Sequence, residues 1–417
     1  MRRMLVWGLY ALVLALAPLV FTSSHSQALL SQIGIAIIVC LSYNMLLGQG
    51  GMLSFGHAVY SGVGAFLAIH TLNFVGDGLA LPVSLIPLVG GLASLALALL
   101  LGWVTTKKSG TPFAMITLGL GEMVWAMALM FPGFFGGEAG VSGNRVAGSP
   151  VLGITFGPQI ELYYLIALYT LVCTALMYAF TRTPLGRMLN AVRDNPERVA
   201  FIGYNPQMVR YLAFAIAAFF AGISGGLAAL SFEIVTFEVL SGYRSGLYLL
   251  FTFLGGTNFF FGPIVGAILM VLALVLLSEF TQAWLLYLGL MFILMVMVAP
   301  GGVAALIMAN LRLAKAGHLR RLWPGYLVLL ATALLALAGA AAVLEMVYHL
   351  QLGAALGPEL RFMGVTLNTH APGSWLGAAS VMLLGLGLFE SRWRPFARTW
   401  SEVEQAVSKD IKRGESL

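Results

Sequence analysis

Polar side chains that could bind a solute or take part in a reaction are few in this sequence, and most lie inside long apolar segments. In apolar surroundings such groups need partners, so each one either fixes helix packing through hydrogen bonds or lines a solute pathway. The candidate pathway residues are Asn44, Gln49, Ser54, His57, Glu122 and Asn258. Both interpretations stay open for each of them.

Glu122 is the most informative of these residues, because it lies in the apolar stretch TLGLGEMVW with no other charge nearby. Its carboxyl group is therefore neutral, paired with a distant donor or facing water, where it could meet the ammonium group of a solute. His57 is expected to pack rather than to bind a metal, because no Cys, Asp or Glu stands beside it at ligand spacing. We expect no metal and no other cofactor.

A serine and a histidine in two apolar segments suggest one enzymatic alternative. Ser224, in Gly222-Ile-Ser-Gly225, could act as a nucleophile with His57 as its base, as in an intramembrane serine protease. Gly-rich packing helices produce the same four residues, and here the His precedes the Ser, opposite to the rhomboid proteases. We therefore favour a packing role for this motif.

The elements that hold these residues are membrane helices, as the distribution of charge indicates. Residues 4–76, 245–278 and 280–311 contain no Asp, Glu, Lys or Arg, and only 9% of the chain is charged while 60% is hydrophobic. A charge in the middle of a membrane helix costs roughly 2.5–3.5 kcal/mol on insertion scales. The sequence predicts an all-α polytopic membrane bundle of about 10–12 transmembrane helices.

Twelve spans follow from apolar runs of about 17–25 residues. They lie near 4–22, 29–47, 53–71, 79–104, 111–131, 161–181, 209–231, 243–258, 262–279, 283–299, 323–345 and 374–390. The segments 53–71 and 243–279 could instead be broken or re-entrant. The first span also resembles a signal peptide, but its apolar run is long and no clean cleavage site follows, so we expect it to be retained.

The basic residues orient the bundle, because short cytoplasmic loops hold an excess of Lys and Arg. With both termini in the cytoplasm, all but three of the 22 Lys and Arg residues fall inside. The three exceptions are Arg145, Arg244 and Arg361. The net charge of +6 is thus a topology signal rather than a nucleic-acid surface. Cys40 and Cys173 are expected to be buried small hydrophobic residues.

The loop at residues 182–210 holds a dense group of charges between two spans. Pro184 can begin a short helix, and Asn195-Pro196 can end it and begin a second one. Such a pair would lie along the membrane face, with its charges toward a partner and its apolar residues anchoring it or entering a groove. The charged residues are Arg187, Arg193, Asp194 and Arg198. The apolar residues are Leu185, Leu189, Val192 and Val199. A solvated loop is the alternative.

The run from Gly186, GRMLNAVRDNPERVAFIGYNPQMVRYLAFAIAAFFAGISGGLAAL, resembles a loop and helix of the LivH/LivM-type permeases, the membrane subunits of branched-chain amino acid ABC importers. Three further blocks follow the family's order and spacing: LSYNMLLGQGGMLSFGHAVYSGVGAF at 41–66, GTPFAMITLGLGEMVWAM at 110–127 and FTFLGGTNFFFGPIVGAIL at 251–269. The motif Ala299-Pro300-Gly301-Gly302 is similar to the family's usual ending. The resemblance covers residues 30–305.

This resemblance implies that the charged loop docks on a cytoplasmic ATPase as a coupling element. The residues carried over are Gly186, Arg187, Ala191, Arg193, Asp194, Asn195 and Gly203. The chain itself has no G-x-x-x-x-G-K-[ST] loop, so ATP would be bound by partner subunits. The implied partners are a second homologous permease, two ATP-binding subunits and a periplasmic solute-binding protein, all at the bacterial inner membrane. Substrates would be branched-chain or other apolar amino acids, with urea, short amides or organic acids as alternatives.

Other features support weaker expectations. A permease domain at 1–305 would be followed by an extension at 306–417 with two further spans and a charged tail. The Gly-rich outer loop 132–160 could receive a solute-binding protein. The blocks 50–65 and 255–267 suggest a parallel internal repeat. An ion-coupled carrier that needs no ATPase remains a rival hypothesis, but it leaves the charged loop without a purpose.

Overall fold

The computed structural model describes residues 2–146, 155–299, 301–315, 319–352, 357–362 and 364–412. Residues 147–154 of the expected outer loop and Pro300 of the family motif lie outside the described residues. The chain forms two compact units, which we describe separately. The first comprises Met1–Phe280 and Leu288–Ala305, and the second comprises Thr281–Tyr287 and Leu306–Leu417.

The described part of the chain is almost entirely helical. In chain order the elements are α1 (Arg2–Val20), α2 (Ser24–Asn44), the π-helical turn η1 (Met45–Gln49), α3 (His57–Gly76), the 3-10 turn η2 (Val83–Leu85), α4 (Ile86–Thr105), α5 (Thr111–Met130), α6 (Pro132–Phe135), the 3-10 turn η3 (Gly137–Ala139), β1 (Val141–Ser142), α7 (Gln159–Arg182), α8 (Pro184–Asp194), α9 (Pro196–Phe201), α10 (Pro206–Phe232), β2 (Ile234–Val235), the 3-10 turn η4 (Phe237–Leu240), α11 (Gly242–Gly255), α12 (Gly262–Leu272), the π turn η5 (Ala273–Leu277), α13 (Ser278–Phe280), α14 (Trp284–Val298), α15 (Gly302–Lys315), α16 (Leu319–Leu352), β3 (Glu359–Phe362), β4 (Val365–Asn368) and α17 (Pro372–Lys412). This confirms the predicted all-α membrane bundle.

The number of full-length spans is smaller than the twelve predicted. Among the described residues, eight helices are long and apolar enough to cross a membrane, or nine if α14 and α15, which meet at 51°, form one broken span. The predicted spans 4–22, 243–258 and 262–279 correspond to shorter apolar helices. With 14 residues, α11 is about 21 Å long at 1.5 Å per residue, which is less than the hydrocarbon thickness of about 30 Å.

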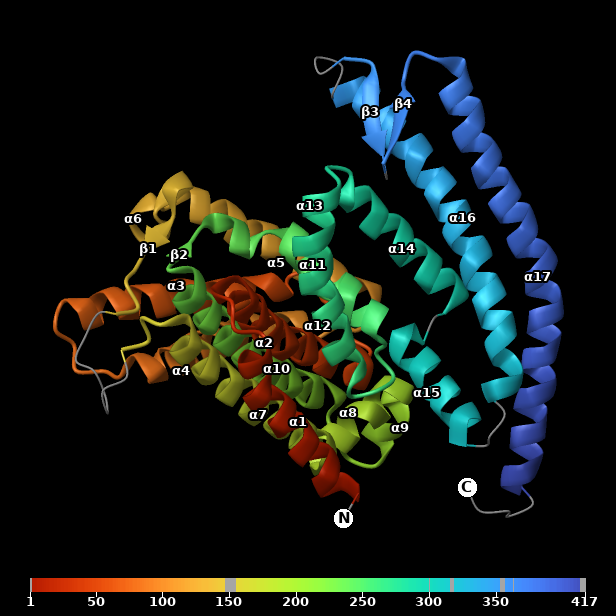
Figure 1. The fold of residues 1–417 in the computed structure, drawn as a ribbon. Helices are drawn as coiled ribbons and strands as arrows, with labels where there is room; N and C mark the ends of the chain where they lie inside the picture. Colours follow the sequence, from red (N-terminus) through yellow and green to blue (C-terminus); the bar gives the residue numbers. More distant parts are fainter. Residues whose placement is uncertain are drawn as a thin grey trace. The chain divides into compact units, whose positions relative to one another are not determined.

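The centre of the first unit is a junction where α10 packs against α2, α3 and α4 (Figure 1). Glycines make this close approach possible: a Cβ on Gly64 would lie 2.6 Å from the Cα of Gly222, and one on Gly90 would lie 2.6 Å from the oxygen of Gly64. The Ser94 hydroxyl donates to the carbonyl oxygen of Tyr60 at 2.6 Å. Small residues drive helix association in lipid through such backbone contacts.

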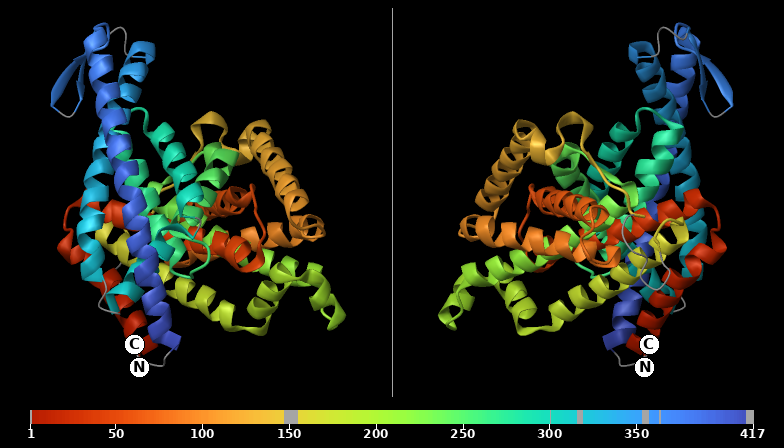
Figure 2. Two further views of the ribbon diagram at one scale, coloured as in Figure 1. Left: turned by 90° about the vertical axis from the view of Figure 1, so that its right-hand side faces the viewer. Right: turned by 90° about the vertical axis from the view of Figure 1, so that its left-hand side faces the viewer.

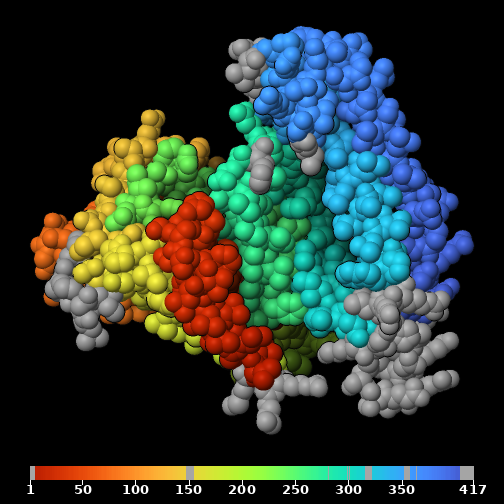
Figure 3. Space-filling model, in the orientation of Figure 1, coloured from red at the N-terminus to blue at the C-terminus, as the bar shows by residue number. Residues whose placement is uncertain are grey.

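Helix α1 lies on the surface of the first unit beside α7 (Figure 3). The Tyr163 hydroxyl donates to the carbonyl oxygen of Leu14 at 2.7 Å, and the rings of Trp7 and Tyr178 meet edge to face. The other side of α1 exposes apolar side chains such as Leu5 and Val6. Such a face suits contact with lipid.

The second unit is built on the antiparallel helices α16 and α17, which run side by side (Figure 2). A Cβ on Gly339 would lie 2.7 Å from the Cα of Met382, and one on Gly385 would lie 2.6 Å from the Cα of Ala336. At one end β3 and β4 form an antiparallel hairpin with Phe362 opposite Val365. This pair of helices is therefore held by small-residue packing, as in the first unit.

Candidate functional site

The charged loop forms the two short helices predicted from its prolines, and they lie at an edge of the first unit (Figure 2). Thr183 caps α8 by accepting from the backbone N–H of Gly186 at 3.2 Å. Asn195 caps α9 by accepting from that of Arg198 at 2.9 Å. Each cap satisfies an otherwise unpaired N–H, and each following proline occupies a position that needs no N–H.

Two roles were expected for the apolar residues of this loop, anchoring it or entering a partner's groove, and three of these residues take the first. Leu189, Val192 and Val199 are buried within the chain's own fold, so they are not free to enter a partner's groove. A helical apolar face indicates burial, but it does not tell which surface covers it. Exposed apolar side chains instead come from the last residue of α9 and the turn after it.

This exposed apolar group consists of Phe201, Ile202 and Tyr204. Phe201 is 90% exposed, Ile202 61% and Tyr204 50%. Gly203 between them has a φ of 91°, which favours glycine. We call this group the apolar tip. Its sequence signal is a run of large apolar residues within an otherwise charged loop.

Helix α8 is attached to the π turn η1 at the end of α2. Arg193 Nη1 donates to the carbonyl oxygen of Gly48 at 2.5 Å, and Asn190 Nδ2 donates to Gln49 Oε1 at 2.9 Å. A Cβ on Gly51, where φ is 62°, would lie 2.8 Å from Arg193 Cγ. Any displacement of α8 therefore reaches η1 directly. Single π-helical turns such as η1 often occur at functional sites in helices.

The remaining loop residues have distinct surroundings. Gly186 is buried, and a Cβ there would overlap the carbonyl oxygen of Phe180. Arg187 is exposed and Ala191 is half-buried. Asp194 is exposed and pairs with Arg193 at 3.1 Å.

Two glycine turns meet beside this attachment. Gly51 and Gly256 both have positive φ, and both stand six residues before a helix, α3 at His57 and α12 at Gly262. Gly48 packs directly against the carbonyl oxygen of Thr257. The two turns are thus similar in form and in contact with each other.

Three of the candidate pathway residues lie in the packed interior. Asn44 is 2% exposed, and Ser54 and His57 are 0% exposed. His57 Nε2 lies 2.8 Å from Ser42 Oγ, and the Tyr43 hydroxyl donates to the carbonyl oxygen of Ser54 at 2.7 Å. Within the described residues Asn44 Oδ1, Ser54 Oγ and His57 Nδ1 have no hydrogen-bond partner. These residues are placed between helices, which favours the packing interpretation.

The other three candidates are accessible. Gln49 bonds to Asn190, and Asn258 is exposed. Glu122 is exposed on α5, and its Oε1 lies 2.7 Å from where a Cβ on Gly242 would be. Asn44 and Thr257, the residue before Asn258, both pack against Gly48, so the segments of Asn44, Gln49 and Asn258 meet there.

The serine and histidine of the protease alternative do not form a pair. The Ser224 hydroxyl donates to the carbonyl oxygen of Ile35 at 3.0 Å, while His57 bonds to Ser42. Gly222 and Gly225, on either side of Ser224, pack against neighbouring helices. The motif Gly222-Ile-Ser-Gly225 has a packing role.

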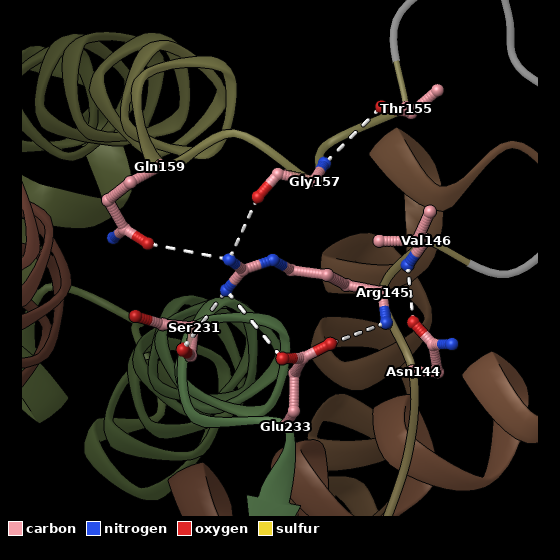
Figure 4. A network of polar contacts seen from close by, with 8 residues as sticks. All are labelled: Asn144, Arg145, Val146, Thr155, Gly157, Gln159, Ser231 and Glu233. Atoms are coloured by element: carbon pink, nitrogen blue, oxygen red, sulfur yellow. Dashed lines mark hydrogen bonds and ion pairs between the residues drawn. The ribbon is translucent and has the colours of Figure 1, made fainter. Parts of the chain in front are cut away.

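Arg145, one of the three arginines that the predicted topology places outside the cytoplasm, ties the loop after α6 to the end of α10 (Figure 4). Its Nη1 lies 4.0 Å from Glu233 Oε2, its backbone N–H donates to Glu233 Oε1 at 2.9 Å, and its Nη2 donates to the oxygen of Gly157 at 3.2 Å. β1 pairs with β2 beside it, with Val141 opposite Val235. Glu233 adopts a left-handed φ of 55°, a conformation that no sequence pattern indicated.

We expect Arg145→Met to loosen this loop. A hydrogen bond to a charged group is worth about 1.5–3 kcal/mol, so amide exchange of residues 141–146 should become roughly tenfold faster or more. Hydrogen–deuterium exchange in detergent measures the change, with Arg361→Met in β3 as the matched control. Equal exchange in Arg145→Met and the unaltered chain would contradict a clamping role.

Comparisons with known proteins found a matching family model and similar relatives. The model of a family described as the branched-chain amino acid transport system / permease component matches residues 27–300. The high-affinity branched-chain amino acid transport system permease protein LivM of Salmonella typhimurium is 29% identical over 328 residues, covering 74% of this chain and 76% of the relative. LivM of Escherichia coli is 28% identical over 325 residues, covering 72% and 75%. No solved structure matches.

Proposed function

Since this chain belongs to the family of permease components of branched-chain amino acid transport systems, we propose that it is the membrane-spanning subunit of an ATP-driven importer. Its substrates would be branched-chain or other apolar amino acids, as the names of its relatives suggest. The same type of permease for urea, short amides or organic acids is the alternative. The chain would act as a transport subunit and not as an ATPase.

The observation that carries this proposal is the attachment of α8 to the π turn at the end of α2. The apolar tip and the exposed Arg187 and Arg198 give the loop a surface for a cytoplasmic ATPase. The bond from Arg193 to Gly48 would pass movement of that ATPase to α2. Closure of the ATPase dimer would then open the pathway outward, and reopening would close it.

The complete importer would contain further subunits. We infer a second homologous permease, two cytoplasmic ATP-binding subunits and a periplasmic solute-binding protein that meets the loop around Arg145. Both termini would lie in the cytoplasm of a bacterium, with the chain in the inner membrane. Transport would belong to residues 1–305, and we assign no activity to residues 306–417.

Copurification tests the docking surface. We expect the double variant Phe201→Ser and Ile202→Ser to lose the ATPase subunit that the unaltered chain retains in detergent, because buried apolar contacts anchor such interfaces. The matched control is Phe74→Ser with Leu79→Ser. It removes two exposed apolar residues at the C-terminal end of α3, outside the charged loop. If no ATPase accompanies even the unaltered chain, in cells that hold all subunits, an ion-coupled carrier becomes the better hypothesis.

A further inference from the structure

A cavity lies between α2, α3, α10, α11 and α12 of the first unit, away from the charged loop. Its volume is about 110 Å³. Most of its wall is aliphatic, with Ile35, Val39, Ala228 and Met270 among the lining residues. For comparison, an apolar cavity of about 150 Å³ binds benzene. The space therefore suits a short branched aliphatic group.

Polar groups gather in this apolar wall. Arg244, Gln32, Tyr248 and Ser61 line the same cavity. Tyr248 and Ser61 make a weak contact of 3.5 Å between their hydroxyl oxygens. Within the described residues, the side chains of Arg244 and Gln32 have no hydrogen-bond or ion-pair partner. The guanidinium group thus offers all its N–H donors to whatever enters.

The acidic residues near Arg244 do not neutralise it. Glu233 is engaged by Arg145, and Glu122, which lies beside Gly242, is not part of the cavity wall. Glu238 of η4 is exposed and forms no ion pair within the described part of the chain. An arginine within a membrane bundle generally pairs with an anion or marks a solute pathway. Arg244 is half-buried and has no ion-pair partner among the described residues, so its charge is available to an anion from outside this chain.

We propose that this cavity binds the carboxylate of the transported solute through Arg244, with the solute's branched aliphatic group against Ile35, Val39 and Met270. A planar guanidinium matches a carboxylate by two parallel hydrogen bonds. Gln32 and Tyr248 can take up a further polar group. This inference rests on the proposed transport function, and it favours amino acids and aliphatic acids over urea and neutral amides.

Binding to the full chain in detergent tests the proposal without the ATPase. The probes are leucine, 4-methylpentanoate (which keeps the carboxylate and lacks the amino group), leucinamide and urea. We expect the two carboxylates to bind and leucinamide and urea to bind at least tenfold more weakly. Arg244→Met should weaken both carboxylates at least tenfold, and Arg244→Lys should restore part of the loss. Arg361→Met, an exposed arginine outside the cavity, is the matched control.

A second variant separates loss of the site from loss of the fold. Ala228 is half-buried at the cavity wall, so Ala228→Leu should fill the space and weaken leucine while Arg244 remains in place. Equal binding of leucine by Arg244→Met and the unaltered chain, equal binding of leucinamide and leucine, or no binding of either carboxylate would each overturn the proposal. Copurification of the ATPase is independent of these results. Carboxylate binding through Arg244 without an ATPase partner would overturn the importer and leave the cavity site standing.

Discussion

Replacing Arg193 by methionine is expected to reduce ATP-dependent uptake by roughly 5- to 150-fold. This range corresponds to the coupling free energy of about 1–3 kcal/mol that is typical between two sites. The change removes the donor that joins α8 to the carbonyl oxygen of Gly48. It keeps an aliphatic stem against Gly51, so the packing of the loop is largely preserved. Uptake by proteoliposomes that contain the whole complex measures the effect, with ATP hydrolysis recorded in parallel.

This variant differs from one that prevents docking. In Arg193→Met the apolar tip is unchanged, so the ATPase should still copurify and hydrolyse ATP while uptake fails. Arg392→Met, at an exposed arginine of α17, removes the same charge away from the loop and should leave uptake unchanged. Normal uptake by Arg193→Met would show that the bond to Gly48 transmits nothing.

Replacing Gly225 by leucine is expected to prevent recovery of folded protein. A Cβ at this position would overlap the carbonyl oxygen of Ser61, which belongs to the backbone of α3 and cannot rotate away. Inserting atoms into a packed core typically costs about 1–3 kcal/mol, and more when backbone must move. The loss would be a large part of the roughly 5–15 kcal/mol that stabilises a folded protein. The yield of monodisperse protein in detergent and its melting temperature measure the result.

The matched control is Gly119→Leu in α5. No atom lies within 4 Å of a Cβ built on Gly119, so this variant should fold and melt like the unaltered chain. Equal yields of the Gly225 and Gly119 variants would contradict the tight contact between α3 and α10.

Local patterns predicted the helices around the charged loop well. Pro184 and the pair Asn195-Pro196 fixed where α8 and α9 begin, because capping and proline geometry depend on a few neighbouring residues. The eight longest spans were also evident from hydropathy. The short helices α11 and α12 were less predictable, since an apolar run does not tell a full crossing from a partial one.

Contacts between distant segments could not be predicted in the same way. The sequence left open whether Leu189 anchors the loop or enters a partner's groove, because periodicity defines a face and not its neighbour. In the structure Leu189 is buried within the chain's own fold. For His57 and Ser224 a packing role was favoured over a nucleophile and base, and each bonds to a different partner. Arg145 and Arg244 were exceptions to the rule on basic residues. A specific contact accounts for the position of Arg145, namely its ion pair with Glu233.

The pairing of β1 with β2 also constrains the order in which the chain matures during synthesis. The bond from the Arg145 backbone to Glu233 spans 88 positions along the sequence. At about 5–20 residues per second, a ribosome needs roughly 4–18 s to make that interval. During this time α5 and α7 have left the ribosome, but their connecting segment has no strand to pair with. The contact between β1 and β2 is thus completed only after α10 has been synthesised.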